Sequence, residues 1–419
     1  MSALRSAAVL ARPRPAAAPA PAEPVPAARA GTTAALFGFA LAGFCSFLGF
    51  YASMPLLPLL QRVFAVSEAE AALTVSAPTI AVALASPFAG VVARRFGSRR
   101  TIVASLLALP IPALLAATAP TVHALVAWRF LQGLAVPGIY AVGMAYLSAS
   151  WPADTLGRAM SALITGNVIG GFSGRFVSGI AADHLGGWRV AFAALAVITA
   201  IAAGIAIRLL PREGAPAAGG AAAPERGRLR DVLGRTPLLA TFAVGFMVLF
   251  TQVATFTYVT FHLSAPPFGL GTSALSYLFT VYLVGAVVTP FAGRWIDRVG
   301  SRRAISAALA AGVGGAALTL APSLPLVVAG LAVVSTAVFV SQAASITYLR
   351  TAAPPHAHST ASGLYVSIYY VGGAAGGVVP AIAWRAGGWG ACIALVVAVQ
   401  LATVAVARGA WRGAERARS

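Results

Sequence analysis

The sequence predicts an all-α integral membrane protein with twelve transmembrane helices arranged as two six-helix repeats. Its composition, its succession of apolar stretches and an internal repeat support this fold class. Of the 419 residues, 59% are apolar and only 9% are charged, whereas soluble proteins carry roughly 25% charged residues. Because so few charges cannot cover a surface that faces water, we exclude a soluble globular protein.

Apolar stretches follow one another along the chain, and each is about as long as the roughly 20 residues that a helix needs to cross a bilayer. They are residues 33–56, 70–92, 101–119, 122–147, 159–181, 189–209, 237–261, 273–293, 303–320, 325–348, 360–383 and 389–407. Only helices and closed barrels satisfy the backbone in lipid, so we expect each stretch to be a transmembrane helix.

A break after the sixth stretch divides the chain into two halves. We expect an N-terminal six-helix half at residues 33–210, a cytoplasmic linker at 211–236 and a C-terminal six-helix half at 237–408. Residues 1–32 are rich in alanine and proline and contain four arginines. This composition predicts a disordered basic tail, and residues 409–419 form a second predicted tail.

The two halves share motifs at a nearly constant offset. The segment Gly90–Arg100 recurs as Gly293–Arg303, 203 residues later, and the glycines of 170–174 recur in 372–376, 202 residues later. Spaced motifs that keep one offset indicate an internal duplication. Two six-helix halves in parallel repeat are typical of transporters, whose binding site lies between the halves near the middle of the membrane.

The basic residues predict the orientation. All 29 are arginine, against 10 acidic residues, and the formal net charge is +19. The predicted spans place 24 arginines on the side of the N-terminus and three on the opposite side, with Arg129 and Arg175 inside spans. By the positive-inside rule both termini lie in the cytoplasm of a multi-pass protein of the cell membrane. The arginines form short clusters between spans, so we expect the lipid bilayer as a partner and no nucleic acid.

Several classes of chemistry are excluded. Without lysine the chain has neither a GxxxxGK phosphate-binding loop nor a lysine Schiff base. It also lacks HExxH, GxSxG and a pair of carboxylates inside the membrane. Cys45 and Cys392 both fall within apolar stretches, where cysteine acts as a packing residue. We therefore expect no enzyme activity, no metal site and no cofactor.

Four motifs resemble those of the major facilitator superfamily, and in particular its twelve-helix drug and sugar (arabinose-type) efflux subgroup. The resemblance covers about residues 33–408. The loop signature G-x-x-x-D-R-x-G-R-R is similar to 90–100 and 293–303, although Arg94 replaces the aspartate in the first copy. The first span ends in LGFYASMPLLP (residues 48–58), and the fourth carries LVAWRFLQG (125–133). The fifth carries GNVIGGFSGR (166–175), in which Gly171 replaces proline and Arg175 replaces the last glycine.

The resemblance implies a secondary active transporter that works by alternating access and functions as a monomer. It also implies that the loop signatures bias one conformation, and that Asp297 pairs with Arg158 or a neighbouring arginine, as a single latch, to hold the cytoplasmic side closed. The loop residues to which it assigns this role are Gly90, Arg94, Gly97, Arg158, Gly293, Asp297, Arg298, Gly300 and Arg302. Gly166, Gly170, Gly171 and Gly174 are expected to let another helix approach closely.

The candidate substrate site consists of polar side chains within spans. The two charged ones, Arg129 and Arg175, are candidates for function because a buried charge in a membrane is costly. For Arg129, a structural role against backbone carbonyls is the alternative. The whole set is Arg129, Gln132, Asn167, Arg175, Gln252, Tyr282, Gln342 and Tyr369. Aromatic and aliphatic surroundings with few hydrogen-bonding groups suit a small, apolar or uncharged solute, but each tyrosine can equally be a packing residue.

Proton coupling is implied by the resemblance but has no obvious carrier. None of the ten acidic residues lies in the middle of a predicted span, and Asp183 with His184 is the best candidate. Two other functions stay open. Because both charges inside the spans are positive, the chain can instead be an importer or exchanger of a small anionic metabolite. A membrane sensor that transports nothing is the alternative from a different class.

Overall fold

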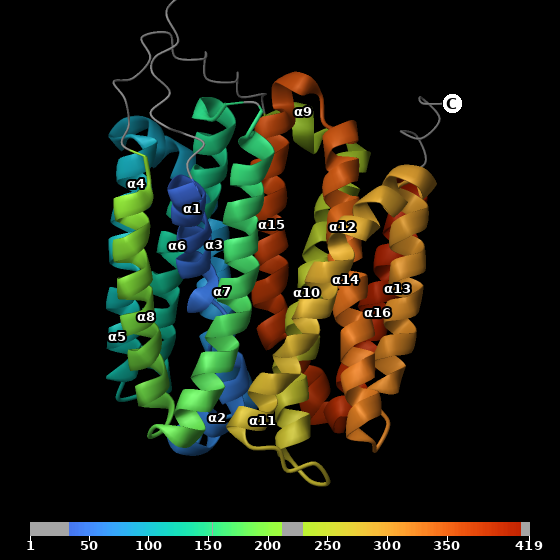
Figure 1. Ribbon diagram of the computed structural model, residues 1–419. Coiled ribbons are helices and arrows are strands. Elements are labelled where there is room, and N and C mark those ends of the chain that lie inside the picture. The colour runs from blue at the N-terminus through green and yellow to red at the C-terminus, as the bar shows by residue number, and fades with distance from the viewer. Residues whose placement is uncertain (1–32, 153, 212–228, 412–419) are drawn as a thin grey trace, which may run out of the picture.

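The computed structural model describes residues 33–152, 154–211 and 229–411, and every regular element within these ranges is helical. All twelve predicted spans are helical over most of their length. Within these ranges, seven helical stretches are each long and apolar enough to cross a membrane by their length and composition. The predicted tail 1–32, residues 212–228 of the predicted linker and residues 412–419 of the second tail lie outside the described residues. Figure 1 shows the helices side by side in one bundle.

The helices of the first half carry the six predicted spans. They are α1 (Thr33–Leu48), η1 (Met54–Leu56), α2 (Leu57–Phe64), α3 (Glu68–Phe96), α4 (Ser98–Ala108), α5 (Pro110–Ala117), α6 (Val122–Ser150), α7 (Leu156–His184) and α8 (Trp188–Leu209). The first span differs from the prediction, because its helix stops at Leu48 and resumes at Met54 as η1 and α2. Pro55 and Pro58, which were expected near the end of this span, lie in the first turns of η1 and α2, where proline is tolerated.

The second half repeats this pattern. Its helices are α9 (Leu229–Leu233), α10 (Thr236–Ser264), α11 (Thr272–Tyr277), η2 (Leu278–Thr280), α12 (Val281–Val299), α13 (Ser301–Leu318), α14 (Leu324–Ala352), η3 (Pro355–Ala357), α15 (His358–Val378) and α16 (Pro380–Ala410). The short helix α9 lies inside the predicted linker, where Val232 is buried against Leu238 and Phe242. The last two predicted spans meet at Gly387 and Gly388, whose backbone is not helical.

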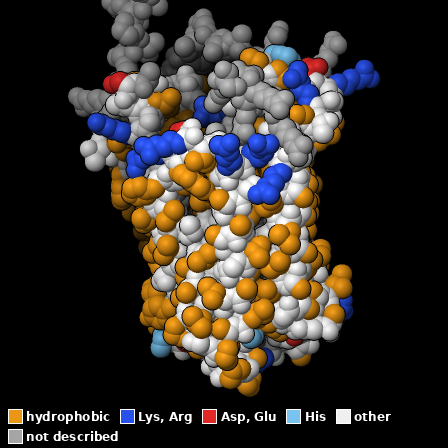
Figure 2. All heavy atoms as spheres, turned by 90° about the vertical axis from the view of Figure 1, so that its right-hand side faces the viewer, with side chains coloured by type: hydrophobic (Ala, Val, Ile, Leu, Met, Phe, Trp, Pro, Cys, Tyr) orange, Lys and Arg blue, Asp and Glu red, His pale blue; other side chains and the backbone are white. Residues whose placement is uncertain are grey.

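The two ends of the bundle differ in charge. We call one the arginine-rich end; there α3 passes into α4 with Arg94 and Arg95, and α12 passes into α13 with Arg302 and Arg303. The far end carries α2 and α11 (Figure 1). Figure 2 shows Lys/Arg side chains, which in this chain are all arginine, gathered at one edge of a broad apolar surface. This distribution fits a body embedded in lipid with a charged rim.

Glycines let helices approach closely within each half. A Cβ added to Gly166, Gly170 or Gly174 of α7 would overlap the carbonyl group of Ala40, Phe44 or Leu48 in or beside α1. In the second half, Gly372 and Gly376 of α15 stand in the same relation to Phe246 and Phe250 of α10. The repeated glycines therefore mark the same tight helix pair in both halves, as small residues do in membrane proteins.

The halves touch each other near the far end. The Ser76 hydroxyl of α3 donates a hydrogen bond to the Ala374 carbonyl of α15 at 2.8 Å. On the other side of the bundle, Phe176 of α7 packs edge-on against Tyr277 of α11, with ring centroids 5.3 Å apart. A Cβ on Gly179 would lie 2.8 Å from the Thr272 carbonyl oxygen. The two halves are thus packed backbone to backbone at this end.

Candidate functional site

Arg129 of α6 is completely buried and satisfies the backbone where the first span is interrupted. Its Nε donates to the Thr74 carbonyl at 3.2 Å and one terminal nitrogen donates to the Gly49 carbonyl at 2.6 Å. The other terminal nitrogen donates to the Phe50 carbonyl. Carbonyls beyond the last turn of a helix lack intrahelical partners and attract positive charge. These contacts favour the structural role for Arg129.

Gln132 lies one turn along α6 and accepts a hydrogen bond from Arg129 through its side-chain oxygen. The glutamine is 4% exposed, and a Cβ on Gly49 would overlap its amide nitrogen. Both residues therefore belong to a packed core that holds α1, α3 and α6 together.

Arg175 of α7 is 4% exposed but has a different environment. Its guanidinium carbon lies 4.7 Å from the centre of the Tyr51 ring, 4.6 Å from that of Tyr282 and 5.3 Å from that of Phe279. Tyr51 belongs to the first span, whereas Phe279 and Tyr282 belong to the second half. Aromatic faces stabilise a desolvated cation. The guanidinium therefore sits in an aromatic cage built by both halves.

Three buried polar atoms at this cage have no hydrogen-bond partner in the described part of the chain, namely Arg175 Nε, Gln252 Oε1 and the Tyr282 hydroxyl. One terminal nitrogen of Arg175 donates to the Gly171 carbonyl at 2.7 Å, but its Nε has no acceptor. Gln252 of α10 lies beside the Tyr282 hydroxyl, and its side-chain oxygen has no donor. A buried polar atom without a partner is costly and rare. A donor and an acceptor left unpaired together indicate a place where a polar ligand or water binds.

Aromatic side chains extend the cage between the halves. Phe50 lies edge-on to Tyr370 of α15, with ring centroids 5.9 Å apart, and Phe47 packs at 6.2 Å against Tyr140 of α6. The Tyr140 hydroxyl interacts with the side chain of Asn167. These contacts place the predicted site residue Asn167 in the same aromatic surroundings as the cage.

The remaining predicted site residues are on the second half. Tyr369 of α15 is half-buried and packs edge-on against Tyr370, with ring centroids 5.5 Å apart, and stacks on Tyr365 at 5.9 Å. The side chain of Gln342 on α14 is half-buried and makes no hydrogen bond within the described residues. The structure thus brings together Arg175, Gln252 and Tyr282, and within the described residues it gives the Gln342 side chain no hydrogen bond to them.

The loop residues have the same backbone in both copies of the signature. Gly97 and Gly300 each follow the last helical residue with φ of 91° and 84°, a region that favours glycine. Asp297 and Arg158 are both exposed, and neither forms an ion pair in the described ranges. The predicted contact between them is not made in this conformation. Nε2 of His356 lies 3.4 Å from a carboxylate oxygen of Asp231, a contact that is an ion pair only when the imidazole is protonated.

Asp183 makes a contact across the halves that sequence reasoning missed. Its carboxylate accepts a hydrogen bond at 2.6 Å from the backbone N–H of Ser273 in the first turn of α11. The sequence singles out Asp183 as a candidate proton carrier, but it does not indicate which segment the carboxylate meets. The start of helix α11 after Gly271 is the feature that could have indicated this contact, because the free backbone N–H groups at the start of a helix bind carboxylates.

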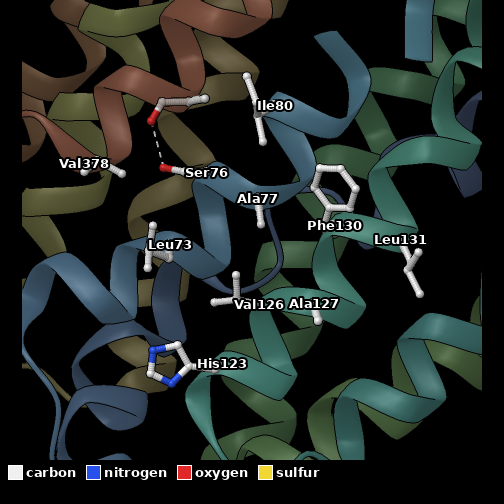
Figure 3. A pocket seen from close by; sticks show the side chains of 11 residues that line it. Leu73, Ser76, Ala77, Ile80, His123, Val126, Ala127, Phe130, Leu131 and Val378 are labelled. Carbon is white, nitrogen blue, oxygen red and sulfur yellow. Dashed lines mark hydrogen bonds between the residues drawn. The ribbon is translucent and has the colours of Figure 1, made fainter. Parts of the chain in front are cut away.

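An apolar pocket of about 660 Å³ lies apart from this site (Figure 3). It is bounded by α3, α6 and α15, and its polar side chains are those of Ser76 and His123. In the close-up, the Ser76 hydroxyl points to the α15 carbonyl, and His123 lies at the opposite end of the pocket. None of the predicted substrate-site residues lines it.

Comparison with known proteins identifies the family. Residues 39–377 match the family model described as Major Facilitator Superfamily. The chain belongs to the major facilitator superfamily. It is 31% identical over 358 residues to the MFS-type transporter YybF of Bacillus subtilis (strain 168), a match that covers 84% of this chain and 87% of that one. It is 30% identical over 380 residues to the inner membrane transport protein YnfM of Escherichia coli (strain K12), covering 88% of both chains.

Solved structures share the fold. A bacterial homologue of the human lysosomal transporter Spinster, crystallised in an inward-facing and occupied conformation, superposes with a TM-score of 0.73 at 16% identity. The superposition covers 90% of this chain and 96% of the other. As a major facilitator, the chain is a multi-pass membrane transporter and not an enzyme, and its substrate is a small molecule bound within the membrane.

Proposed function

We propose that this transporter exports a small, largely apolar or uncharged solute, drug-like or sugar-like, through a site at the Arg175 cage. The observation that carries the proposal is the pair of unpaired buried atoms, Arg175 Nε and Gln252 Oε1, on opposite halves of the bundle. A solute with one acceptor and one donor would satisfy both. Binding would then depend on the relative position of the halves, as alternating access requires.

The aromatic cage favours an uncharged solute over an anion. Three rings already face the Arg175 guanidinium at 4.6 to 5.3 Å, and this contact stabilises the positive charge without a counter-ion. The neighbouring rings of Phe47, Phe50 and Tyr370 provide flat apolar surface, which is the usual lining of sites for small organic ligands.

A small anionic metabolite is the second candidate. Arg175 is 4% exposed and no acidic side chain contacts it within the described residues. Its unpaired Nε–H is a donor of the kind that arginine uses to bind carboxylates. Under this alternative, the anion would supply a negative charge that stabilises the Arg175 guanidinium, whereas in the first proposal the aromatic rings alone stabilise it.

We further propose that the arginine-rich end faces the cytoplasm of the inner membrane and that transport is proton-coupled through Asp183. The positive-inside rule supports the orientation, and the name of YnfM supports the membrane. The Asp183 carboxylate accepts a hydrogen bond from the Ser273 N–H across the halves. Protonation would weaken this charge-assisted hydrogen bond and would thereby favour opening of the far end.

Uptake into proteoliposomes tests these proposals. Purified chain is reconstituted with and without an imposed pH gradient and assayed with matched neutral and carboxylate solutes of similar size. We expect transport of neutral solutes, a KM raised about tenfold or more in Arg175→Gln because the substrate loses a hydrogen bond to a charged donor, and little change in the exposed control Arg62→Gln. Transport confined to carboxylates and abolished in Arg175→Gln would favour the anion alternative.

The same assay separates coupling from binding. Asp183→Asn should lose the stimulation by a pH gradient while it keeps exchange of substrate between the two sides, because its amide cannot ionise. Equal stimulation of the wild type and Asp183→Asn would exclude Asp183 as the proton carrier.

A further inference from the structure

The apolar pocket of about 660 Å³ lies where the two halves meet. The first half contributes α3 and α6 to its walls, and the second half contributes α15 (Figure 3). Nine of its eleven lining residues are apolar. Arg175, Gln252 and Tyr282 are not among them, so the pocket is separate from the aromatic cage and the proposed transport does not account for it.

The pocket opens on the outer side of the bundle. A Cβ on Gly133 of α6 would overlap the Pro78 backbone of α3, so the two helices touch there. Beside this contact the small side chains of Ala77 and Ala127 leave room between the helices. Leu131 in the wall is 45% exposed. Because the halves are packed together at the far end, an exposed side chain here faces the surroundings of the bundle, which in a membrane transporter are lipid.

The long axis of the pocket follows the helices. In the close-up, His123 lies at one end of the pocket and Ile80 at the other (Figure 3). His123 is exposed in the first turn of α6, at the far end of the bundle. From His123 to Leu131 the helix rises about 12 Å at 1.5 Å per residue. One leaflet supplies roughly 15 Å of hydrocarbon, half the thickness of the bilayer core. The pocket therefore has the length and the direction of one lipid tail.

The middle of the pocket favours hydrocarbon over a polar ligand. The Ser76 hydroxyl already donates its hydrogen to the Ala374 carbonyl at 2.8 Å. The other polar side chain in the lining, His123, lies at the end of the pocket. Burying a polar group without a partner costs free energy, so a solute that carries polar groups along its length is disfavoured. His123 instead stands at the level where the ester and headgroup of a lipid would lie.

We propose that this pocket binds one acyl chain of a glycerophospholipid from the leaflet at the far end. Lipid tails are as apolar as the pocket itself, so close fit and dispersion hold the chain there rather than the hydrophobic effect. The chain contacts α3 and α6 of one half and α15 of the other. It therefore favours the conformation that keeps these helices together. The proposal is independent of the substrate and of the direction of transport.

Photocrosslinking of the full chain in vesicles tests the proposal. The probe is phosphatidylcholine with a diazirine midway along one acyl chain, diluted into unlabelled phosphatidylcholine, and mass spectrometry locates the labelled residues. We expect residues 73–80, 126–131 and 374–378 to be labelled about five times more than the exposed surface around Ala329 of α14. Roughly ten additional atom contacts in the pocket, each weak, add up to this factor.

A matched pair of substitutions separates the pocket from the lipid-facing surface in general. Ala127→Phe fills the pocket with a ring without changing the charge, and it should remove the excess labelling. Ala329 is the equivalent of Ala127 in the internal repeat, 202 residues later, and it is likewise exposed at the same distance from the start of its helix. It does not line the pocket, so Ala329→Phe should leave the excess unchanged. Leu131→Ala removes part of the wall and should lower the excess as well, which keeps the test valid if Ala127→Phe does not fold.

Four outcomes would overturn the proposal. Labelling of the pocket and of the Ala329 surface to the same extent would show that ordinary surrounding lipid is all that the probe detects. An excess that survives both Ala127→Phe and Leu131→Ala would place the bound chain elsewhere. Loss of the excess on addition of a compact apolar solute such as adamantane would assign the pocket to a solute. Loss of the excess only when the chain dimerises would assign it to a second copy of the chain.

Discussion

The packing of α3 against α15 predicts how a single methyl group shifts the conformational equilibrium. A Cβ on Gly377 of α15 would overlap the Ser76 hydroxyl of α3, the same hydroxyl that donates to the Ala374 carbonyl. Overpacking of this kind costs about 1–3 kcal/mol. Because the two residues belong to different halves, Gly377→Ala should destabilise the conformation closed at the far end by that amount.

Since about 1.4 kcal/mol changes an equilibrium tenfold, the population open at the far end should rise about 5- to 150-fold. The measurement is the rate of thiol labelling of Ser276→Cys in a chain without Cys45 and Cys392. Ser276 is fully buried between the halves in this conformation, so its labelling reports opening of the far end.

Two companion variants make this test specific. Gly363→Ala on the same helix adds a methyl group where nothing lies within 4 Å, and should label like the parent. Ser76→Ala alone removes one hydrogen bond worth about 1 kcal/mol and should label about fivefold faster. Adding Ser76→Ala to Gly377→Ala should bring labelling back to that level. Labelling of Gly377→Ala at the parent rate, or no relief by Ser76→Ala, would refute the steric argument.

Two further predictions concern residues that the sequence singles out. Arg129→Ala should lower thermal stability, by about 1–3 kcal/mol, because it leaves the buried Phe50 carbonyl without a donor among the described residues and removes one of the donors to the Gly49 and Thr74 carbonyls. Normal melting in detergent together with lost transport would instead assign Arg129 to transport. Asp297→Asn should raise the population open at the arginine-rich end and lower transport, whereas Arg94→Ala should do little. If both substitutions shift the accessibility of cysteines placed at that end equally, the idea that Asp297 alone holds this end closed is wrong.

The sequence predicted the helices well because lipid imposes one strong requirement, apolar length. It did not predict that the helix of the first span is interrupted after Leu48. The stretch around Gly49 and Phe50 is apolar, and its departure from a helix depends on Arg129, 80 residues away from Gly49. Such a contact leaves no local periodicity. The two prolines nearby, Pro55 and Pro58, indicated a helix end but not the helix that follows them.

The same distinction applies to the candidate site. The sequence selected Arg129 and Arg175 by one criterion, a charge inside a span, and the structure gives them different surroundings. Arg129 meets backbone carbonyls, whereas Arg175 meets three rings. A carbonyl partner is invisible in a sequence, because every residue has one. The cage around Arg175 could not be predicted because Tyr51 and Tyr282 lie far from it in the chain.

The glycines of α7 and α15 have a consequence for how this protein tolerates change. Where Gly166, Gly170 and Gly174 meet the backbone of the first span, even one methyl group has no room, whereas the arginines of the loops are largely exposed. A deep mutational scan should therefore show near-total intolerance along these glycines and broad freedom in the loops. If proteins descended from this chain acquire different substrates, the changes should therefore lie in side chains between the two halves, while the glycine-packed helix pair within each half stays nearly unchanged.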